Sequence, residues 1–380
     1  MKILVIQESY VQGGADRSLI DLIRDWPIIS DYFVVAINGG HPHPGFLSEV
    51  PVLRSAYLSW RDRTRQARDQ NSRGWIQPLV HFVRTFVELE QLIRRERPGA
   101  LILNNGGFPG GSSLYLALVS AACLRVPRRI MIIRNYPGPT VSRWRIVLAT
   151  VILVAFRPRI VSVSHSLAAF LVQQARLPSS QVRTIHDGVE SPKRERQLGS
   201  SPCSISIIGT VEERKGHEIL IRALALLSEK HPALSLLIIG HCDESERQRL
   251  VAVAEQLHVE RQLRWCPHVS DIDAAFAQVD ILAVPSIRQE SFGRVAVEAI
   301  ARGIPVVASN CGGLPEVIED GVSGIIVPRG DPESLASALD RVLCDLSVRQ
   351  RFAKEGMQRF RTLFSASRMA CEYAQLLQGD

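Results

Sequence analysis

The sequence predicts an α/β protein of two domains, each built on a doubly wound parallel sheet. Three observations indicate this architecture. The 380 residues exceed what one hydrophobic core usually holds. Short strand-like runs alternate with helix-length amphipathic segments along the chain. Near the middle, residues 190–202 carry two prolines and lose all periodicity, so they predict a linker between two such series.

The first series is predicted to form one domain over residues 1–189. Its strand-like runs are residues 2–7, 33–37, 100–103, 130–133, 160–163 and 182–185. The main helices expected between them are residues 15–24, 75–97 and 112–124. The basic stretch 54–73 interrupts the alternation and predicts a long loop or interaction arm, with an ordinary solvated insertion as the alternative.

The second series is predicted to form a domain over residues 203–362. Its strand-like runs are residues 204–208, 235–239, 263–265, 281–284, 305–308 and 324–327. Residues 363–380 predict a final helix that packs back on the first domain. Two such domains joined by one linker predict a ligand cleft between them. The longest apolar run, residues 146–156, is too short to span a bilayer and predicts a buried helix.

Charge is unevenly divided between the halves. The net charge is +7, and residues 1–190 hold 23 basic against 13 acidic side chains. Between Glu96 and Asp187 there is no carboxylate, whereas eleven arginines occur. This predicts a first domain facing an anionic bilayer, a phosphorylated substrate or a nucleic acid, the last disfavoured because no nucleic-acid-binding motif is present. A scattered solvated surface in an arginine-rich chain is the alternative.

The cysteines and the first residues indicate the compartment. The seven cysteines lie more than twenty residues apart, without metal-ribbon or disulfide-framework spacing, so we expect reduced thiols. The chain starts directly with a strand-like run and lacks the apolar core and cleavage site of a signal peptide. We therefore expect a cytoplasmic protein.

Two carboxylates flank a predicted helix start in the second domain. Glu290 lies in the loop after the strand 281–284, and Glu298 lies on the helix after Gly293. Unpaired N–H groups and the positive dipole end make a helix start suitable for a diphosphate. Glu298 can then accept hydrogen bonds from a ribose diol and Glu290 from sugar hydroxyls. Taken alone, the pair also fits a solvated helix face.

Lys215 strengthens this interpretation. It is one of five lysines and lies in the turn between Gly209 and Gly216, after the first strand of the second domain. Ligands of open α/β sheets bind at this edge, where an ammonium can neutralise a phosphate leaving group. A surface lysine at a helix start is the alternative.

Several motifs occur in the order found in one family. They are residues 13–16 (GGAD), 161–164 (VSVS), 185–189 (IHDGV), 215–216 (KG), 290–298 (ESFGRVAVE), 312–316 (GGLPE) and 321–328. On these residues the chain resembles GT-B-fold retaining glycosyltransferases of family 4, also called group 1. The resemblance covers most of the chain and is stronger in the second domain.

The resemblance implies two Rossmann-like domains facing a central cleft and a hexosyltransferase activity that needs no metal or cofactor. Lys215 and Glu290 would be the catalytic residues. The donor, a nucleotide diphosphate sugar, would contact Gly209, Lys215, His268, Glu290, Ser291, Phe292, Gly293 and Glu298. Gly13, Gly14, Arg134 and Asn135 would lie on the acceptor side of the cleft.

Three residues depart from the family pattern. Thr210 stands where many members have an arginine that shares the diphosphate with the lysine. Asp187 replaces a common asparagine, a mild change because both residues tolerate the turn. Arg134 and Asn135 stand where members often present a histidine near the reacting sugar.

The expected function is retaining transfer of a sugar to an acceptor hydroxyl in surface polysaccharide or glycolipid synthesis. The acceptor would be a sugar or a lipid-linked glycan, at the inner face of the plasma membrane. A nicotinamide-dependent oxidoreductase is disfavoured, because the glycine-rich turn 101–112 lacks the GxGxxG spacing. A nucleotide-sugar epimerase and a degenerate, membrane-associated scaffold remain alternatives.

Overall fold

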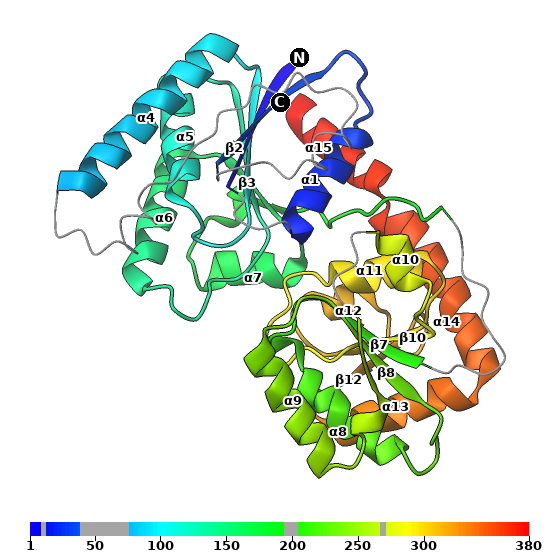
Figure 1. The fold of residues 1–380 in the computed structure, drawn as a ribbon. Helices are drawn as coiled ribbons and strands as arrows, with labels where there is room; N and C mark the ends of the chain where they lie inside the picture. The colour runs from blue at the N-terminus through cyan, green and yellow to red at the C-terminus, as the bar shows by residue number, and fades with distance from the viewer. Residues whose placement is uncertain (9–12, 39–75, 194–203, 267–270, 380) are drawn as a thin grey trace. The chain divides into compact units, whose positions relative to one another are not determined.

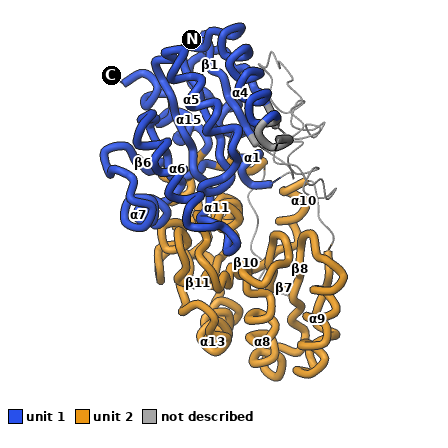
Figure 2. Tube along the Cα trace, turned by 90° about the vertical axis from the view of Figure 1, so that its left-hand side faces the viewer, with its two compact units in different colours: residues 1–188, 366–380 blue, residues 189–365 orange. Residues whose placement is uncertain are grey.

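The chain divides into two compact units. The computed structural model describes residues 1–8, 13–38, 76–193, 204–266 and 271–379. Unit 1 comprises Met1–Gly188 and Ala366–Asp380, and unit 2 comprises Val189–Ser365 (Figure 2). The predicted basic stretch 54–73 and most of the predicted linker lie outside the described residues.

Unit 1 contains a parallel sheet (Figure 1) of six strands. Their order in the sheet is β2-β1-β3-β4-β5-β6. Its strands are β1 (Lys2–Glu8), β2 (Tyr32–Asn38), β3 (Ala100–Asn105), β4 (Arg128–Ile133), β5 (Arg159–Ser162) and β6 (Val182–Thr184). All six residues of the inner strand β3 are buried. Helices cover both faces of such a sheet, which is why these strands are near-continuous apolar runs.

The helices of unit 1 come from both ends of the chain. They are α1 (Gly14–Arg24), α4 (Ile76–Glu96), α5 (Ser112–Cys123), α6 (Arg143–Phe156), α7 (His165–Gln173) and α15 (Ala366–Gln378). Met369, Tyr373 and Leu377 of α15 are buried in one cluster with Ile3 and Val5 of β1. The last helix is therefore part of the core of unit 1.

The prediction of a buried helix over residues 146–156 is wrong. The helix forms, as α6, but only Ala149 and Leu153 are buried. Most of its other apolar side chains are exposed, from Trp144 to Val154. A run of apolar residues predicts the helix but does not tell how many of its faces the fold covers, and here the fold covers one.

Unit 2 contains a second six-stranded parallel sheet, in the order β12-β11-β10-β7-β8-β9. Its strands are β7 (Ser204–Ile208), β8 (Ser235–Ile239), β9 (Leu263–Cys266), β10 (Ile281–Val284), β11 (Val306–Ser309) and β12 (Ile325–Val327). The order of the strands reverses between β7 and β10. Ligands of open α/β sheets bind at such a switch point, beyond the carboxyl ends of the strands.

Helices surround this sheet as well. They are α8 (His217–Leu227), α9 (Glu244–Gln256), α10 (Ile272–Phe276), α11 (Arg294–Ala301), α12 (Leu314–Val317), α13 (Pro332–Cys344) and α14 (Leu346–Arg359). Every predicted strand is present, with each end within two residues of its predicted position, so the predicted fold class is confirmed. Within the described residues, no helix is both long and apolar enough to cross a membrane.

Candidate functional site

The loop after β7 carries Lys215 to the switch point of the second sheet. Lys215 ends a short 3-10 turn, and Gly216 then starts α8 in the left-handed region, with φ 76°. A Cβ atom on Gly216 would overlap the carbonyl oxygen of Pro285. The amide of Ile287 donates to the carbonyl of Arg214 at 2.9 Å. Glycine is therefore required where this loop contacts the loop after β10.

Lys215 and Glu290 form an ion pair between these two loops. Lys215 Nζ donates to Glu290 Oε2 at 2.5 Å, and the hydroxyl of Ser286 lies 3.3 Å from the same oxygen. A nitrogen of the Arg214 guanidinium lies 3.5 Å from it. Burial opposes the charge of Glu290, but Lys215 and Arg214 outweigh it, so the pKa of this carboxyl lies below its usual value. Glu290 is therefore a carboxylate at neutral pH.

The loop after β11 fixes the backbone of Glu290. The amide of Gly313 donates to the carbonyl of Glu290 at 2.8 Å. Gly312 has φ 58°, and a Cβ atom there would overlap the same carbonyl. Cys311 Sγ lies 2.8 Å from the carbonyl oxygen of Arg288. The glycine pair of the 312–316 motif thus acts through the backbone, by holding the loop that presents Glu290.

Helix α11 begins directly after this loop. Gly293 precedes its first residue in the left-handed region, with φ 96°, and Ser291 and Phe292 are buried. Glu298 lies one turn into the helix, where its Oε1 accepts from Arg294 Nε at 2.9 Å. The carboxylate of Glu298 is thereby oriented on a buried helix surface. The positive end of α11 and the ammonium of Lys215 are both suited to bind an anion beside Glu290.

His217 is a buried titratable group next to Lys215 that the sequence analysis did not consider. Its side chain is buried, and neither ring nitrogen has a hydrogen-bond partner of ordinary geometry. Burial lowers its pKa to about 4, and the backbone of Glu212 offsets only part of that effect. The imidazole is therefore neutral at pH 7.

Two predicted acceptor-side residues of unit 1 lie at the start of α1. Gly13 and Gly14 are exposed, and Gly13 caps the helix, with its amide donating to Asp16 Oδ2 at 2.9 Å. Their position on the acceptor side of the cleft stays a prediction, as do the cleft itself and the domain boundaries. His268 lies outside the described residues.

Arg134, which the family resemblance assigns to the acceptor side of the cleft, is buried inside unit 1. It is 3% exposed, and its guanidinium donates to Asp187, to the hydroxyl of Ser18 at 2.7 Å and to Asn104 Oδ1 at 2.9 Å. Ser18 also donates to Asp187 at 2.8 Å. The two departures at positions 134 and 187 therefore form one buried ion pair, and the aspartate has more than a turn-forming role.

The neighbouring residue is more accessible. Asn135 is exposed, and its side-chain amide donates to the carbonyl of Gly106 at 2.5 Å. Of the two residues predicted at this position, Asn135 is thus the one that a ligand of unit 1 can reach. Its contact with an acceptor stays a prediction.

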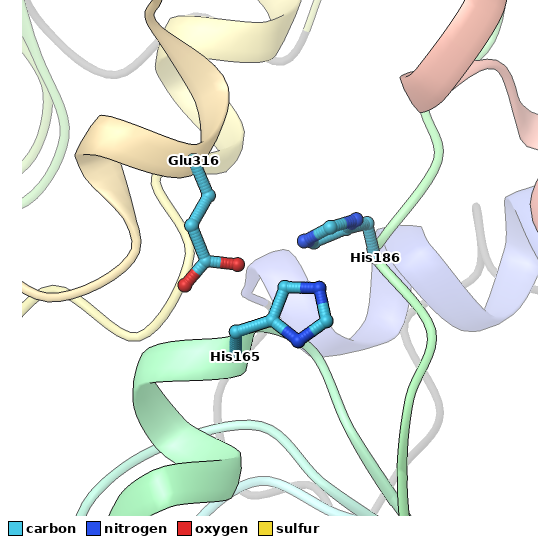
Figure 3. Close-up of side chains that lie close together, drawn as sticks. All are labelled: His165, His186 and Glu316. Carbon is cyan, nitrogen blue, oxygen red and sulfur yellow. The ribbon is translucent and has the colours of Figure 1, made fainter.

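A pair of histidines in unit 1 was missed by sequence reasoning. The rings of His165 and His186 lie edge to face, with centroids 5.3 Å apart (Figure 3). Figure 3 also draws Glu316 of unit 2, which lies on α12. Their positions in the sequence could have indicated this pair, because His165 follows β5 and His186 follows β6 at the carboxyl edge of the sheet.

Comparison with known proteins identifies relatives of this chain. Residues 191–359 match the family described as glycosyl transferases group 1. D-inositol 3-phosphate glycosyltransferase of Corynebacterium jeikeium is 35% identical over 167 residues, which cover 42% of this chain and 40% of that protein. Glycogen synthase of Mycobacterium tuberculosis is 31% identical over 202 residues, which cover 52% and 48%. The matches thus span about half the length of these relatives.

Among solved structures, the chain is similar to Anabaena HepE in complex with UDP and glucose. The TM-score is 0.77 with 19% identity, over 100% of both chains. At this identity the similarity concerns the fold, which is the GT-B fold in both proteins.

Proposed function

We propose that the chain is a retaining glycosyltransferase, because residues 191–359 match the family described as glycosyl transferases group 1. It would transfer a sugar from a nucleotide diphosphate sugar to an acceptor hydroxyl. The observation that carries the proposal is the Lys215–Glu290 pair beside the first turn of α11, at the switch point of the second sheet.

Lys215 and α11 would bind the diphosphate of the donor. The ammonium of Lys215, which is paired with Glu290 in this structure, can pair with phosphate oxygens instead. The dipole of α11 also favours a negative charge at this position. Glu298, already oriented by Arg294, would accept from the ribose hydroxyls. Glu290 would accept from hydroxyls of the donor sugar, which suits a carboxyl that stays ionised.

The reaction would then depend on positioning and charge stabilisation. The acceptor hydroxyl oxygen forms a bond to the anomeric carbon on the face from which the diphosphate leaves. The bond from that carbon to the diphosphate oxygen breaks, and the hydroxyl proton passes to the departing diphosphate. Negative charge develops on the departing phosphate, where Lys215 and the α11 amides stabilise it.

The acceptor proposed is a sugar or lipid-linked glycan used for cell-surface polysaccharide or glycolipid, presented at the cytoplasmic face of the membrane. Supporting this, the first 190 residues carry 23 basic against 13 acidic side chains, whereas the rest of the chain carries 22 against 25. A basic acceptor domain favours a phosphorylated or membrane-presented acceptor.

A ligand panel tests the donor assignment. UDP, GDP, ADP and their hexose conjugates are added to the full chain, and the thermal midpoint is measured, because a ligand of the folded state raises it. We expect one nucleotide family to raise the midpoint. Glu298→Ala should weaken that nucleotide's binding about tenfold, by loss of hydrogen bonds to a charged group. Glu255→Ala, which removes an exposed carboxylate from α9, is the matched control.

The outcome separates the alternatives. No shift with any nucleotide, in protein shown to be folded, would contradict the proposal and favour a scaffold. Isomerisation of the bound nucleotide sugar without any acceptor would indicate an epimerase instead.

A further inference from the structure

Helix α6 presents an apolar face that the described residues of unit 1 leave largely exposed. The exposed apolar side chains are Trp144 (66% exposed), Val147 (60%), Leu148 (51%), Val151 (58%) and Val154 (39%). At 3.6 residues per turn, these positions share one side of the helix. The face is thus continuous along the helix, unlike the single exposed apolar residues that are common on protein surfaces.

The opposite side of α6 holds the helix on unit 1. Ala149 and Leu153 are buried there, and the Thr150 hydroxyl donates to the carbonyl of Ala175 at 3.0 Å. Arg129 donates to the carbonyl of Phe156 at the helix end, at 3.3 Å. Among the described residues, the core of unit 1 therefore buries this side of α6 and leaves the apolar face largely exposed.

Arginines border the apolar face. Arg143 and Arg145 lie exposed in the first turn, on opposite edges of the face, and Arg157 is exposed directly after the last turn. A helix start favours acidic residues, so two cations there oppose the helix dipole. Helix stability does not explain them. No carboxylate occurs between Glu96 and Asp187 that would balance them locally.

An apolar helix face bordered by cations matches the surface of an anionic bilayer. Apolar side chains, tryptophan above all, enter the boundary between headgroups and acyl chains, and arginines meet the lipid phosphates. A second copy of the chain fits less well, because a two-fold contact through α6 would bring like charges together. Crossing the bilayer is not an option for a 14-residue helix.

We propose that α6 docks unit 1 on an anionic bilayer, with its apolar face in the headgroup region and Arg143, Arg145 and Arg157 against lipid phosphates. The docking deepens the proposed function, since it brings the acceptor domain to a membrane where a lipid-linked acceptor resides. It needs no bound donor, so it can be tested separately.

Vesicle binding of the full chain tests the proposal. The protein is sedimented at low and high salt with two kinds of vesicle. One is phosphatidylcholine alone, and the other contains about one third phosphatidylglycerol, an anionic lipid. We expect binding to the anionic vesicles at least tenfold stronger than to neutral ones, weakening as salt screens the arginines. No preference for anionic vesicles at low salt would overturn the proposal.

Variants locate the contact on α6. The triple change Trp144→Ser, Val147→Ser, Val151→Ser and the double change Arg143→Gln, Arg145→Gln should each weaken binding about tenfold or more. Leu226→Ser, which replaces an equally exposed apolar residue of α8 in unit 2, is the matched control and should bind as the wild type does. Equal binding by the triple variant would overturn the assignment to α6.

Two readouts separate this proposal from its alternatives. Vesicles with brominated acyl chains should quench the fluorescence of the wild type, and Trp144→Phe should lose most of that quenching while still binding. A wild-type dimer that the triple variant converts to a monomer, without vesicle binding, would assign the face to a second copy instead.

Nucleotide binding by the triple variant should equal that of the wild type. A failure of the donor proposal would therefore be seen independently of the docking proposal.

Discussion

Each unit places a cation–carboxylate pair beyond the carboxyl ends of its sheet, but the two pairs differ in accessibility. In unit 2, Lys215 and Glu290 come from loops after β7 and β10, and the lysine side chain is 17% exposed. In unit 1, Arg134 and Asp187 follow β4 and β6, and the arginine side chain is 3% exposed. A cation at this edge of a sheet is therefore a candidate for ligand binding only where it remains accessible.

The partners of the two cations explain the difference. Arg134 also donates to Ser18 and Asn104, so two of its three guanidinium nitrogens are bonded to acceptors of unit 1. Lys215 makes one side-chain hydrogen bond among the contacts described, to an oxygen that Arg214 and Ser286 also approach. We interpret the first pair as structural and the second as a pair that a ligand can open.

The largest effect is expected from the structural pair. Arg134→Met should lower the free energy of unfolding by about 3–5 kcal/mol, because it leaves the buried charge of Asp187 without its partner. Urea unfolding followed by circular dichroism measures this. Arg84→Met, which opens the exposed pair with Glu88 on α4, should cost under about 1 kcal/mol. A similar small loss for both variants would mean that the Arg134 pair does not stabilise unit 1.

The Lys215–Glu290 pair should affect activity more than stability. Lys215→Ala should reduce kcat/KM for sugar transfer by about 100-fold, equivalent to about 2.7 kcal/mol. The free energy of unfolding should fall by less than in Arg134→Met, because Arg214 also lies close to the carboxylate of Glu290. Initial rates with labelled donor measure it. Lys230→Ala, in an exposed pair with Asp340, is the matched control and should retain full activity. Equal rates for the two variants would remove Lys215 from the site.

A smaller effect is expected from the pH dependence of His217. The unfolded chain binds a proton at this residue near pH 6.5, whereas the folded chain does so only near the lowered pKa of about 4. Stability is therefore complete above pH 6.5 and falls as the pH drops toward 4, by about 2 kcal/mol between pH 7 and pH 5.

Urea midpoints at these two pH values measure the contribution of His217. In His217→Gln the pH-dependent loss should shrink by about 2 kcal/mol, since the titrating group is gone. His241→Gln, at a side chain 69% exposed, should keep the wild-type dependence. An unchanged dependence in His217→Gln would show that the buried imidazole does not drive it.

The sheets were predictable from the sequence because their strands are short apolar runs separated by helix-length segments. The loops carrying Lys215 and Glu290 were also predictable, since each follows a strand of the second series. Their roles toward a donor stay predictions, as does the role of His268.

What could not be predicted depends on contacts between distant residues. Arg134 and Asp187 are 53 positions apart and share no local pattern, so each was treated as an isolated departure. The exposure of α6 was missed for a related reason: hydropathy records the composition of a helix, and burial depends on which neighbours the fold supplies.

The position of α15 has a consequence for the order in which the units are completed during synthesis. Tyr373 and Met369 fill the core of unit 1 beneath β1, yet α15 follows all of unit 2 in the chain. Domains generally fold as the ribosome releases them, amino-terminal first. Here all residues of unit 2 are synthesised before α15. Synthesis of unit 1 therefore starts first, but its core is completed last.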